Sequence, residues 1–411
     1  MNAIDGAGKN HPIEMDRAPK KLSKRLVGID AARGLALVGM MATHLLPAWN
    51  EDTGEATLSW ILFSGNAAAL FAMLAGVGLA LSTGGRNPHQ GKRLTADRAG
   101  IAVRAVLITL VGLWIGTLMS EEPPAYNILI YYGMFFLLAI PFLRLGPKAL
   151  FVSAGAFGLL APLLMQNLLD VLPEWSSYNP TLGTVLSEPG GTLSQLLLTG
   201  SYPALPYMTY LLAGMAIGRL DLRRIKTQIT LLAAGVGVAV LAHVTSYILL
   251  YGLGGYQRLL DSSRVSEEKL VEILTWGPDS LPTSTPWWLA ITTPHADTPL
   301  SLAASLGVSM AALGAFLLIA RKAGDWLLPL TAMGVMTLTL YTAHLVALSF
   351  EIHYDRPYLW YLIHLVVAAV FALVWYLNLG KGPLERAIGY GVTGARRIVM
   401  GGSSGRTDFG A

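Results

Sequence analysis

The sequence contains no cysteine and few charged residues. The absence of cysteine from its 411 residues excludes disulfides, thiolate nucleophiles, iron–sulfur clusters and thiolate zinc sites. Only 13% of the residues are charged, whereas 53% are apolar, and a soluble protein carries about 25% charged residues. The composition therefore excludes an ordinary soluble protein and favours one that crosses a membrane several times.

Long apolar runs, in contrast, are plentiful. A helix needs about 20 apolar residues to cross a hydrocarbon core that is ~30 Å thick. Such runs predict ten spans, at about 27–48, 58–83, 100–119, 126–143, 149–170, 203–219, 228–251, 299–320, 326–350 and 358–379. We therefore expect an all-α integral membrane protein with about ten transmembrane helices.

Lysines and arginines are distributed unevenly between these runs. They gather in the N-terminal tail and in every second connecting segment, whereas the intervening segments hold few and include the acidic stretches 50–55 and 120–124. Because positive residues resist translocation, both termini are predicted to be cytoplasmic and the protein to lie in the cytoplasmic membrane. We divide the chain into a polar tail (1–25), one membrane domain (26–380) and a basic juxtamembrane segment (381–411).

The first run places an arginine and a histidine on one helix face. Eleven positions separate Arg33 from His44, and on an α-helix this climbs about 16 Å and returns to within ~20° of the same face. Ionisable side chains are costly in hydrocarbon, so this pair is expected to face a cavity or a partner. Asp30 is also placed to pair with Arg33 at the cytoplasmic rim, a role compatible with ligand binding.

The ionisable groups of the spans divide by depth. Arg33 and Arg104 lie at the inner ends of predicted spans. The histidines lie toward the outside and are His44, His243, His344 and His364. Arginine binds phosphate through a planar, permanently charged fork, and histidine near neutral pH acts as a general base or accepts an acyl group. This arrangement suits acyl transfer from an inner phosphate-bearing donor, such as acetyl-CoA, to an outer hydroxyl or amine.

Among the histidines, we expect His44 to be catalytic, as a general base or as an acyl-bearing nucleophile, and His344 to be the second candidate. A structural hydrogen-bonding role is the alternative for both, and it is the favoured interpretation for His243 and His364.

The arginines supply the candidate donor site. Arg33, Arg104 and Arg386 are the predicted ligands for the acyl-CoA, and no metal cofactor is expected. Arg386 belongs to a short C-terminal helix that we interpret first as a membrane anchor, with Leu384, Ile388 and Val392 directed toward lipid, and second as a clamp for the cofactor.

Small residues are concentrated in the stretch from Gly65 to Gly78. Such residues let helices approach closely in lipid, and no strand and loop precede this stretch as a nucleotide motif would require. It is therefore predicted to be a helix-packing face.

The spacing of Arg33 and His44 resembles the arginine–histidine motif in the first span of the transmembrane acyltransferase superfamily. The stretches 28–35, 65–76, 199–206 and 382–385 are similar to bacterial, particularly actinobacterial, proteins of the heparan-α-glucosaminide N-acetyltransferase type. The resemblance implies acetyl-CoA as donor and a glycan or glycolipid of the cell envelope as acceptor.

The chain also departs from related patterns. Arg98 and Arg104 are six positions apart, where many sugar O-acyltransferases have an arginine pair spaced by two residues. Val335 stands where an arginine is often expected in the bacterial group.

The expected partners are membrane lipids, acyl-CoA and an extracytoplasmic glycan or glycolipid, and no nucleic acid. The alternative function is a non-catalytic transporter or flippase for a lipid or small solute. Transporters commonly show repeated halves and helices broken at mid-membrane, and the sequence shows no convincing repeat. The identity of the acceptor, the acyl chain length and the oligomeric state stay open.

Overall fold

The structure is built from helices. This computed structural model describes residues 26–401 except 264, 279 and 353–354, and no β-strand forms within that part of the chain. Its α-helices are α1 (Val27–Leu45), α2 (Leu58–Phe63), α3 (Asn66–Ser82), α4 (Gly91–Gly116), α5 (Leu129–Ala139), α6 (Pro147–Leu168), α7 (Leu182–Ser187), α8 (Pro189–Ser194), α9 (Ala204–Gly218), α10 (Ile225–Tyr247), α11 (Gly255–Ser263), α12 (Glu267–Trp276), α13 (Pro299–Ala323), α14 (Leu328–Val335), α15 (Thr337–Leu348), α16 (Pro357–Leu379) and α17 (Pro383–Met400). Short 3-10 or π segments are η1 (Ile140–Phe142), η2 (Leu169–Val171), η3 (Gln195–Thr199), η4 (Ile248–Gly252) and η5 (Pro286–Ala290).

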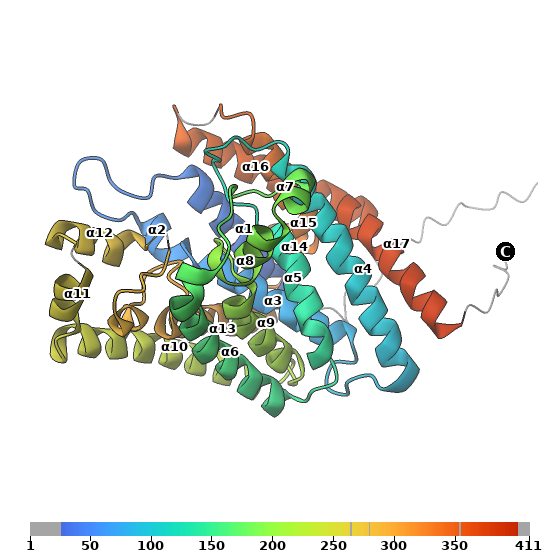
Figure 1. Ribbon diagram of the computed structural model, residues 1–411. Coiled ribbons are helices and arrows are strands. Elements are labelled where there is room, and N and C mark those ends of the chain that lie inside the picture. The colour runs from blue at the N-terminus through green and yellow to red at the C-terminus, as the bar shows by residue number, and fades with distance from the viewer. Residues whose placement is uncertain (1–25, 264, 279, 353–354, 402–411) are drawn as a thin grey trace, which may run out of the picture.

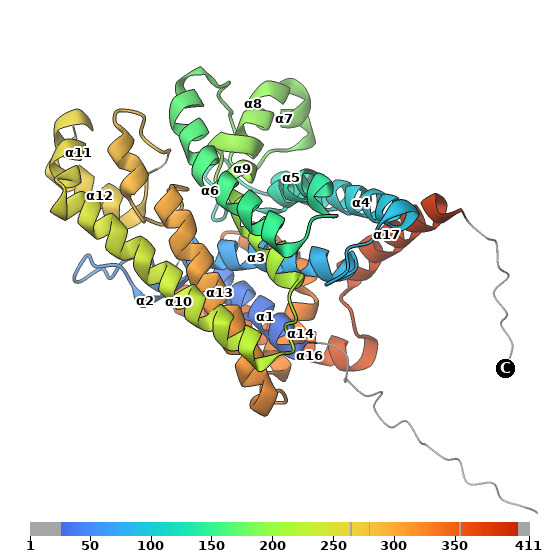
Figure 2. The same ribbon diagram turned by 90° about the horizontal axis from the view of Figure 1, so that it is seen from below.

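Most of the helices form a bundle around one large apolar core, whereas α11 and α12 pack with η5 around a second, smaller one (Figure 1). Helices α11 and α12 lie at one end of this bundle, and α17 lies at the other. Helix α9 packs between α3 and α6, and α10 packs along α13 (Figure 2). The first half of the chain is thus interleaved with the second, as α1 contacts α13, α14 and α16.

Six helical segments of the described chain are long and apolar enough to cross a membrane, and a seventh is added if α14 and α15 form one bent span. These six are Leu58–Ser82, Gly91–Gly116, Pro147–Val171, Ile225–Gly252, Pro299–Ala323 and Pro357–Leu379. Helices also form at the other predicted spans, but α5 and α9 have only 11 and 15 residues. At ~1.5 Å per residue, α5 covers about 17 Å. The chain is therefore a multi-pass, all-helical protein, whereas ten complete spans and the sidedness of the termini stay predictions.

The predicted span 326–350 is not one continuous helix. Helices α14 and α15 meet at Met336 and are bent by 82°. The carboxylate of Glu385 accepts hydrogen bonds from the backbone nitrogens of Leu338 and Thr339, at 2.8 and 3.2 Å, and from Thr339 Oγ1 at 2.6 Å. Backbone donors in the first turn of a helix have no partner within the helix and favour a nearby negative charge. Glu385 of α17 therefore stabilises the start of α15 as a separate helix.

Glycines allow the central helices to approach each other. A Cβ atom at Gly76 would lie 2.0 Å from the carbonyl oxygen of Leu211, and one at Gly214 would lie 1.9 Å from that of Met73. The predicted packing role of the stretch that contains Gly76 is thus confirmed, with α9 as the neighbour.

Helix α17 packs against α4 rather than facing lipid with its apolar side. Ile388 and Val392 are 7% and 8% exposed and belong to the core, so their predicted orientation toward lipid is wrong. Asp97 of α4 joins the two helices, because its carboxylate contacts Arg396 of α17 at 2.9 Å. The same carboxylate contacts His89, which precedes α4, at 2.7 Å. The ion pair to the buried Asp97 and the apolar contacts of Ile388 and Val392 together hold α17 on the bundle.

Candidate active site

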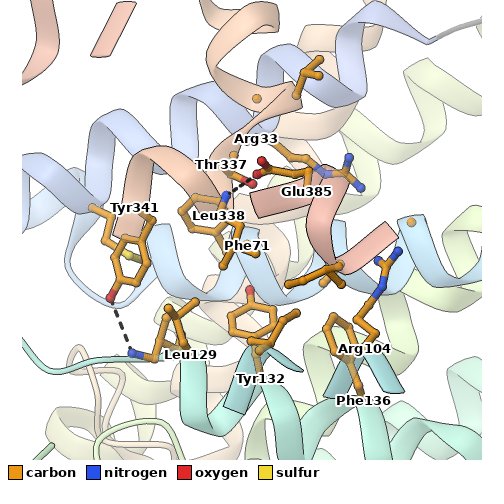
Figure 3. Close-up of a pocket in the computed structure, with 18 of the residues that line it drawn as sticks. Arg33, Phe71, Arg104, Leu129, Tyr132, Phe136, Thr337, Leu338, Tyr341 and Glu385 are labelled. Atoms are coloured by element: carbon orange, nitrogen blue, oxygen red, sulfur yellow. Dashed lines mark hydrogen bonds between the residues drawn. The ribbon is translucent and has the colours of Figure 1, made fainter. Parts of the chain in front are cut away.

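A cavity of about 370 Å³ lies among the helices. Its walls come from α1, α3, α4, α5, α14, α15 and α17. Its polar side chains include Arg33, Arg104, Tyr132, Thr337, Tyr341 and Glu385 (Figure 3). Apolar residues supply most of the remaining wall. Apolar walls with a few polar groups, in a volume of ~300–1,000 Å³, are typical of small-molecule sites.

Arg33 reaches this cavity from α1. Its Nη1 atom lies 3.4 Å from Asp30 Oδ1, and its Nη2 atom donates a hydrogen bond to the carbonyl oxygen of Leu74 at 3.1 Å. A Cβ atom at Gly78 would lie 2.7 Å from Nη2, so the glycine leaves the space that the guanidinium occupies. The ion pair with Asp30 and the position at a cavity, both anticipated from the sequence, therefore coexist.

The other two predicted donor ligands are placed differently. Arg104 lines the cavity from α4, and Figure 3 shows it at the opposite end from Tyr341. Arg386 is not among the lining residues. Its Nη2 atom donates to the carbonyl oxygen of Leu379, and its guanidinium carbon lies 5.9 Å from the ring centroid of Trp375. The structure thus brings Arg33 and Arg104 to one cavity and holds Arg386 against the end of α16.

Two tyrosines and one glutamate in the cavity were not predicted. Tyr341 Oη accepts a hydrogen bond from the backbone nitrogen of Ile128 at 3.5 Å. Tyr132 Oη is buried and has no hydrogen-bond partner among the residues that the structure describes, and Figure 3 shows it directed into the cavity. Buried polar groups are nearly always hydrogen-bonded in proteins. The Tyr132 hydroxyl is therefore a ready donor for a ligand, whereas the Glu385 carboxylate is already occupied by α15.

His44 lies next to the cavity rather than in its wall. Met40, one helical turn earlier on α1, lines the cavity, as does Tyr341. The ring centroids of His44 and Tyr341 are 6.4 Å apart. Arg33 and His44 thus lie in and beside the same cavity, on one side of α1, in agreement with their predicted common face.

Three of the predicted outer histidines meet. His44 Nδ1 lies 3.1 Å from His344 Nε2, and His344 Nδ1 lies 2.7 Å from His364 Nδ1. The first two rings are stacked, with an interplanar angle of 7°, and the rings of His344 and His364 are perpendicular. His344 is only 3% exposed. The sequence placed these residues at similar depth but carried no signal that α1, α15 and α16 are neighbours.

The fourth histidine lies elsewhere. His243 belongs to α10, and its Nδ1 atom is 3.2 Å from Thr292 Oγ1. His11 and His353 lie outside the described residues. Within the part of the chain that is described, no group of three or more histidine or carboxylate side chains is placed to hold a metal ion.

A small cavity of about 30 Å³ is lined in part by the loop that precedes α13. Asp297 lines it and is 6% exposed. Burial raises the pKa of the Asp297 carboxyl well above its usual value, because a charged carboxylate is disfavoured away from water. The backbone of Asp297 has a φ angle of 50°, which few non-glycine residues adopt.

The apolar helices, together with a cavity that carries cationic and phenolic groups, define a multi-pass membrane protein with a candidate ligand site between its helices. The family model described as the catalytic region of heparan-alpha-glucosaminide N-acetyltransferase matches residues 25–251. This match covers more than half of the chain, so the protein belongs to that family, and it is an acetyltransferase by class. A comparison with curated proteins gave no match.

The family match contains one part of the site and not the other. Arg33, His44 and Arg104 lie within it. Tyr341, His344, His364 and Glu385 lie beyond its end and are brought to the same region by α15, α16 and α17. The predicted family is confirmed, whereas the bacterial origin stays a prediction, and the structure places further candidate residues in the same region.

Proposed function

We propose that this protein moves an acetyl group from cytoplasmic acetyl-CoA to a hydroxyl or amine of an extracytoplasmic glycan or glycolipid. The observation that carries the proposal is one cavity lined by Arg33, Arg104 and Tyr341, with His44 beside it. The family supports acetyl transfer as the reaction class. The donor, the acceptor and the residue roles are our proposal.

In this proposal the two cavity arginines bind the phosphates of the donor. A guanidinium keeps its charge and matches phosphate oxygens with a planar fork. The apolar walls accommodate the long arm of the donor, and Tyr132 Oη donates a hydrogen bond to one of its carbonyl oxygens, which supplies the partner that this hydroxyl lacks among the described residues. The acetyl thioester then lies toward Tyr341 and His44.

His44 acts on the acceptor. Its Nε2 atom takes the proton of the acceptor hydroxyl or amine as that atom bonds to the acetyl carbon. The carbon–sulfur bond breaks, and the leaving sulfur of CoA receives from His44 the proton that came from the acceptor. Tyr341 Oη already accepts from Ile128 N, so its own hydrogen is available to the thioester oxygen, where negative charge develops.

A route through acetylated His44 uses the same residues. It differs in forming a covalent intermediate before the acceptor arrives, which gives ping-pong kinetics. Initial rates measured over a grid of donor and acceptor concentrations separate the two routes, because parallel double-reciprocal lines indicate the covalent one.

The decisive experiment measures CoA release and acetyl incorporation by the purified full-length protein in detergent or liposomes. We expect the wild type to consume acetyl-CoA and His44→Ala to lower kcat by about 10²–10⁴-fold, the range for loss of a general base. Unchanged thermal stability of the variant shows that it is folded. A fully active His44→Ala variant would remove His44 as catalyst, and an inactive wild type with a panel of glycan and glycolipid acceptors would contradict the function.

The transporter alternative gains support from one observation, the 82° break between α14 and α15. Transporters often place such breaks at their binding sites. If the protein is a transporter, we expect solute or lipid to cross the membrane of proteoliposomes without release of free CoA. Measurements of transport and of CoA release on the same preparation therefore distinguish the two functions.

A further inference from the structure

The histidines of α1, α15 and α16 form a continuous chain of ring nitrogens. We propose that His364 is a positioning residue that acts through His344 and keeps the proton of His44 on Nδ1, so that Nε2 carries the lone pair for catalysis. This inference rests on the proposed function. The experiment below also tests the position of the proton when no activity is measured.

The geometry joins the rings in series. His344 stands in the middle, and both of its nitrogens are used, Nε2 toward His44 at 3.1 Å and Nδ1 toward His364 at 2.7 Å. Its burial, at 3% exposure, keeps these contacts from being replaced by bulk water. Trp360, one turn before His364 on α16, contacts the His364 ring at a centroid distance of 6.5 Å and an angle of 86°, and it restricts where that ring can lie.

The number of protons restricts the tautomers. Each contact joins two ring nitrogens, so one must carry a hydrogen and the other a lone pair. Three neutral rings carry one hydrogen each, and only two arrangements satisfy both contacts. In the first, His44 Nδ1 donates to His344 Nε2, and His344 Nδ1 donates to His364 Nδ1. In the second, both hydrogen bonds run the other way and His44 carries its hydrogen on Nε2.

Only the first arrangement gives a reactive His44. Its Nε2 then has the lone pair that takes the acceptor proton, whereas the second arrangement presents an N–H bond to the acceptor. In the proposed arrangement His364 carries its hydrogen on Nε2, so its Nδ1 accepts from His344 Nδ1 and keeps the hydrogen of His344 there. His344 Nε2 then accepts from His44 Nδ1, so the tautomer of His364 sets that of a ring two hydrogen bonds away. This is the role that the third member of a catalytic triad has.

The chain also stabilises the charged intermediate of the reaction. When His44 Nε2 holds the acceptor proton, the ring is an imidazolium whose Nδ1–H still donates to His344. Hydrogen bonds to the charged form favour it, and polarisation along connected hydrogen bonds strengthens each of them. As sulfur leaves, it takes the proton from Nε2, and the chain returns to its starting arrangement with no net gain or loss of protons.

The test compares two substitutions at one position. His364→Asn keeps an oxygen near the place of Nδ1 that accepts from His344, whereas His364→Leu removes the acceptor that His364 Nδ1 supplies. We expect His364→Leu to lower kcat by about 10–100-fold, as loss of a supporting hydrogen bond typically does, with the KM for acetyl-CoA nearly unchanged because the arginines are intact. His364→Asn should recover most of that loss. His243→Leu is the matched control, an equivalent change outside the chain, and should behave like the wild type.

The second readout is the tautomer itself, measured by ¹⁵N NMR of the His44 ring in protein labelled at histidine. We expect a protonated Nδ1 in the wild type and in His364→Asn, and a large shift toward protonated Nε2 in His364→Leu. An unchanged tautomer in His364→Leu, equal impairment of the two variants, or full activity of His364→Leu would each overturn the proposal. If the wild type transfers no acetyl group, the proposed function fails, and the NMR result alone decides the role of His364.

Discussion

His44 Nδ1 and His344 Nε2 lie 3.1 Å apart, although 300 positions separate the two residues in the sequence. Helices α1 and α15 bring them together, and Tyr341, one turn before His344, lies beside the His44 ring and lines the cavity. Helix α15 thus contributes both to the position of the proposed catalyst, through His344, and to the wall of the proposed donor site, through Tyr341. Changes that loosen α15 should therefore affect chemistry as well as stability.

Removing a cavity arginine should weaken donor binding. A charge-assisted hydrogen bond contributes about 1.5–3 kcal/mol, so we expect Arg104→Gln to raise the KM for acetyl-CoA by about 10-fold or more. The KM for acetyl-pantetheine, which lacks the nucleotide phosphates, should change little. Arg224→Gln is the control, because Arg224 is exposed and paired with Asp221 at 3.1 Å. Equal losses with both donors would show that Arg104 does not bind phosphate.

Tyr132→Phe should impair activity without destabilising the protein. The buried Tyr132 hydroxyl has no partner among the described residues, so its removal leaves no group unsatisfied and should keep or raise the thermal midpoint. Loss of a hydrogen bond to the donor should lower kcat/KM by about 3–10-fold. Donor-induced thermal stabilisation, measured with the unreactive product CoA, should decrease in parallel if the bonded oxygen belongs to the donor arm. A variant with wild-type kinetics would place the hydroxyl outside the reaction.

Glu385→Ala should destabilise α15. It leaves the backbone nitrogens of Leu338 and Thr339 without the carboxylate that caps them, and loss of a helix cap costs about 0.5–2 kcal/mol. We expect a lower thermal midpoint and a lower kcat, because α15 carries Tyr341 and His344. Glu385→Gln, which keeps one acceptor oxygen, should lie between Glu385→Ala and the wild type. Glu268→Gln on exposed α12 should have no effect, and equal stability of all four proteins would refute the capping role.

Asp297 should make the protein less stable as the pH rises. Burial raises the pKa of this carboxyl in the folded state, whereas the unfolded chain ionises near pH 4. Between these two values the folded state holds a proton that the unfolded state has lost, so the free energy of unfolding falls with increasing pH. Asp297→Asn should raise the thermal midpoint at neutral pH and change it little near pH 4. Asp261→Asn, at an exposed site, is the control. An Asp297→Asn variant with the pH dependence of the wild type would contradict this account.

Gly334→Ala should disrupt the contact between α1 and α14. A Cβ atom at Gly334 would lie 1.7 Å from the carbonyl oxygen of Asp30, so the helices must separate. Overpacking of this kind costs about 1–3 kcal/mol, and we expect a lower thermal midpoint with reduced activity, because Arg33 lies on the displaced helix. Gly155→Ala in α6 meets no atom within 4 Å and should be neutral. Comparable stability of the two variants would show that the contact adjusts without cost.

Hydropathy predicted where helices form, because each expected run contains enough apolar residues for a buried or lipid-facing segment. It could not predict the break at Met336. Gly334 alone is a weak signal, because single glycines are common within membrane helices, and the group that caps α15 is Glu385, which follows Leu338 by 47 positions. The orientation of Ile388 and Val392 was misjudged for a related reason, since an apolar helix face packs equally well on lipid and on a neighbouring helix such as α4.

The site was predictable where charge made residues conspicuous. Arg33, Arg104 and His44 stand out in apolar segments because each is costly there without a partner. Tyr132 did not stand out, since a tyrosine is ordinary in a membrane helix and only the structure shows that its buried hydroxyl has no hydrogen-bond partner among the described residues. For His364, the missing information was which helices are neighbours.

The hydrogen bonds of Glu385 also impose an order on biosynthesis. The ribosome completes α15 and α16 before it reaches the residue that caps α15. A nascent chain halted before Pro383 would already contain every histidine of the described chain, yet the helix that carries His344 would begin with unsatisfied amides. Formation of the proposed catalytic site should therefore wait until α17 leaves the ribosome and docks, and cotranslational probes of that region should report a late transition.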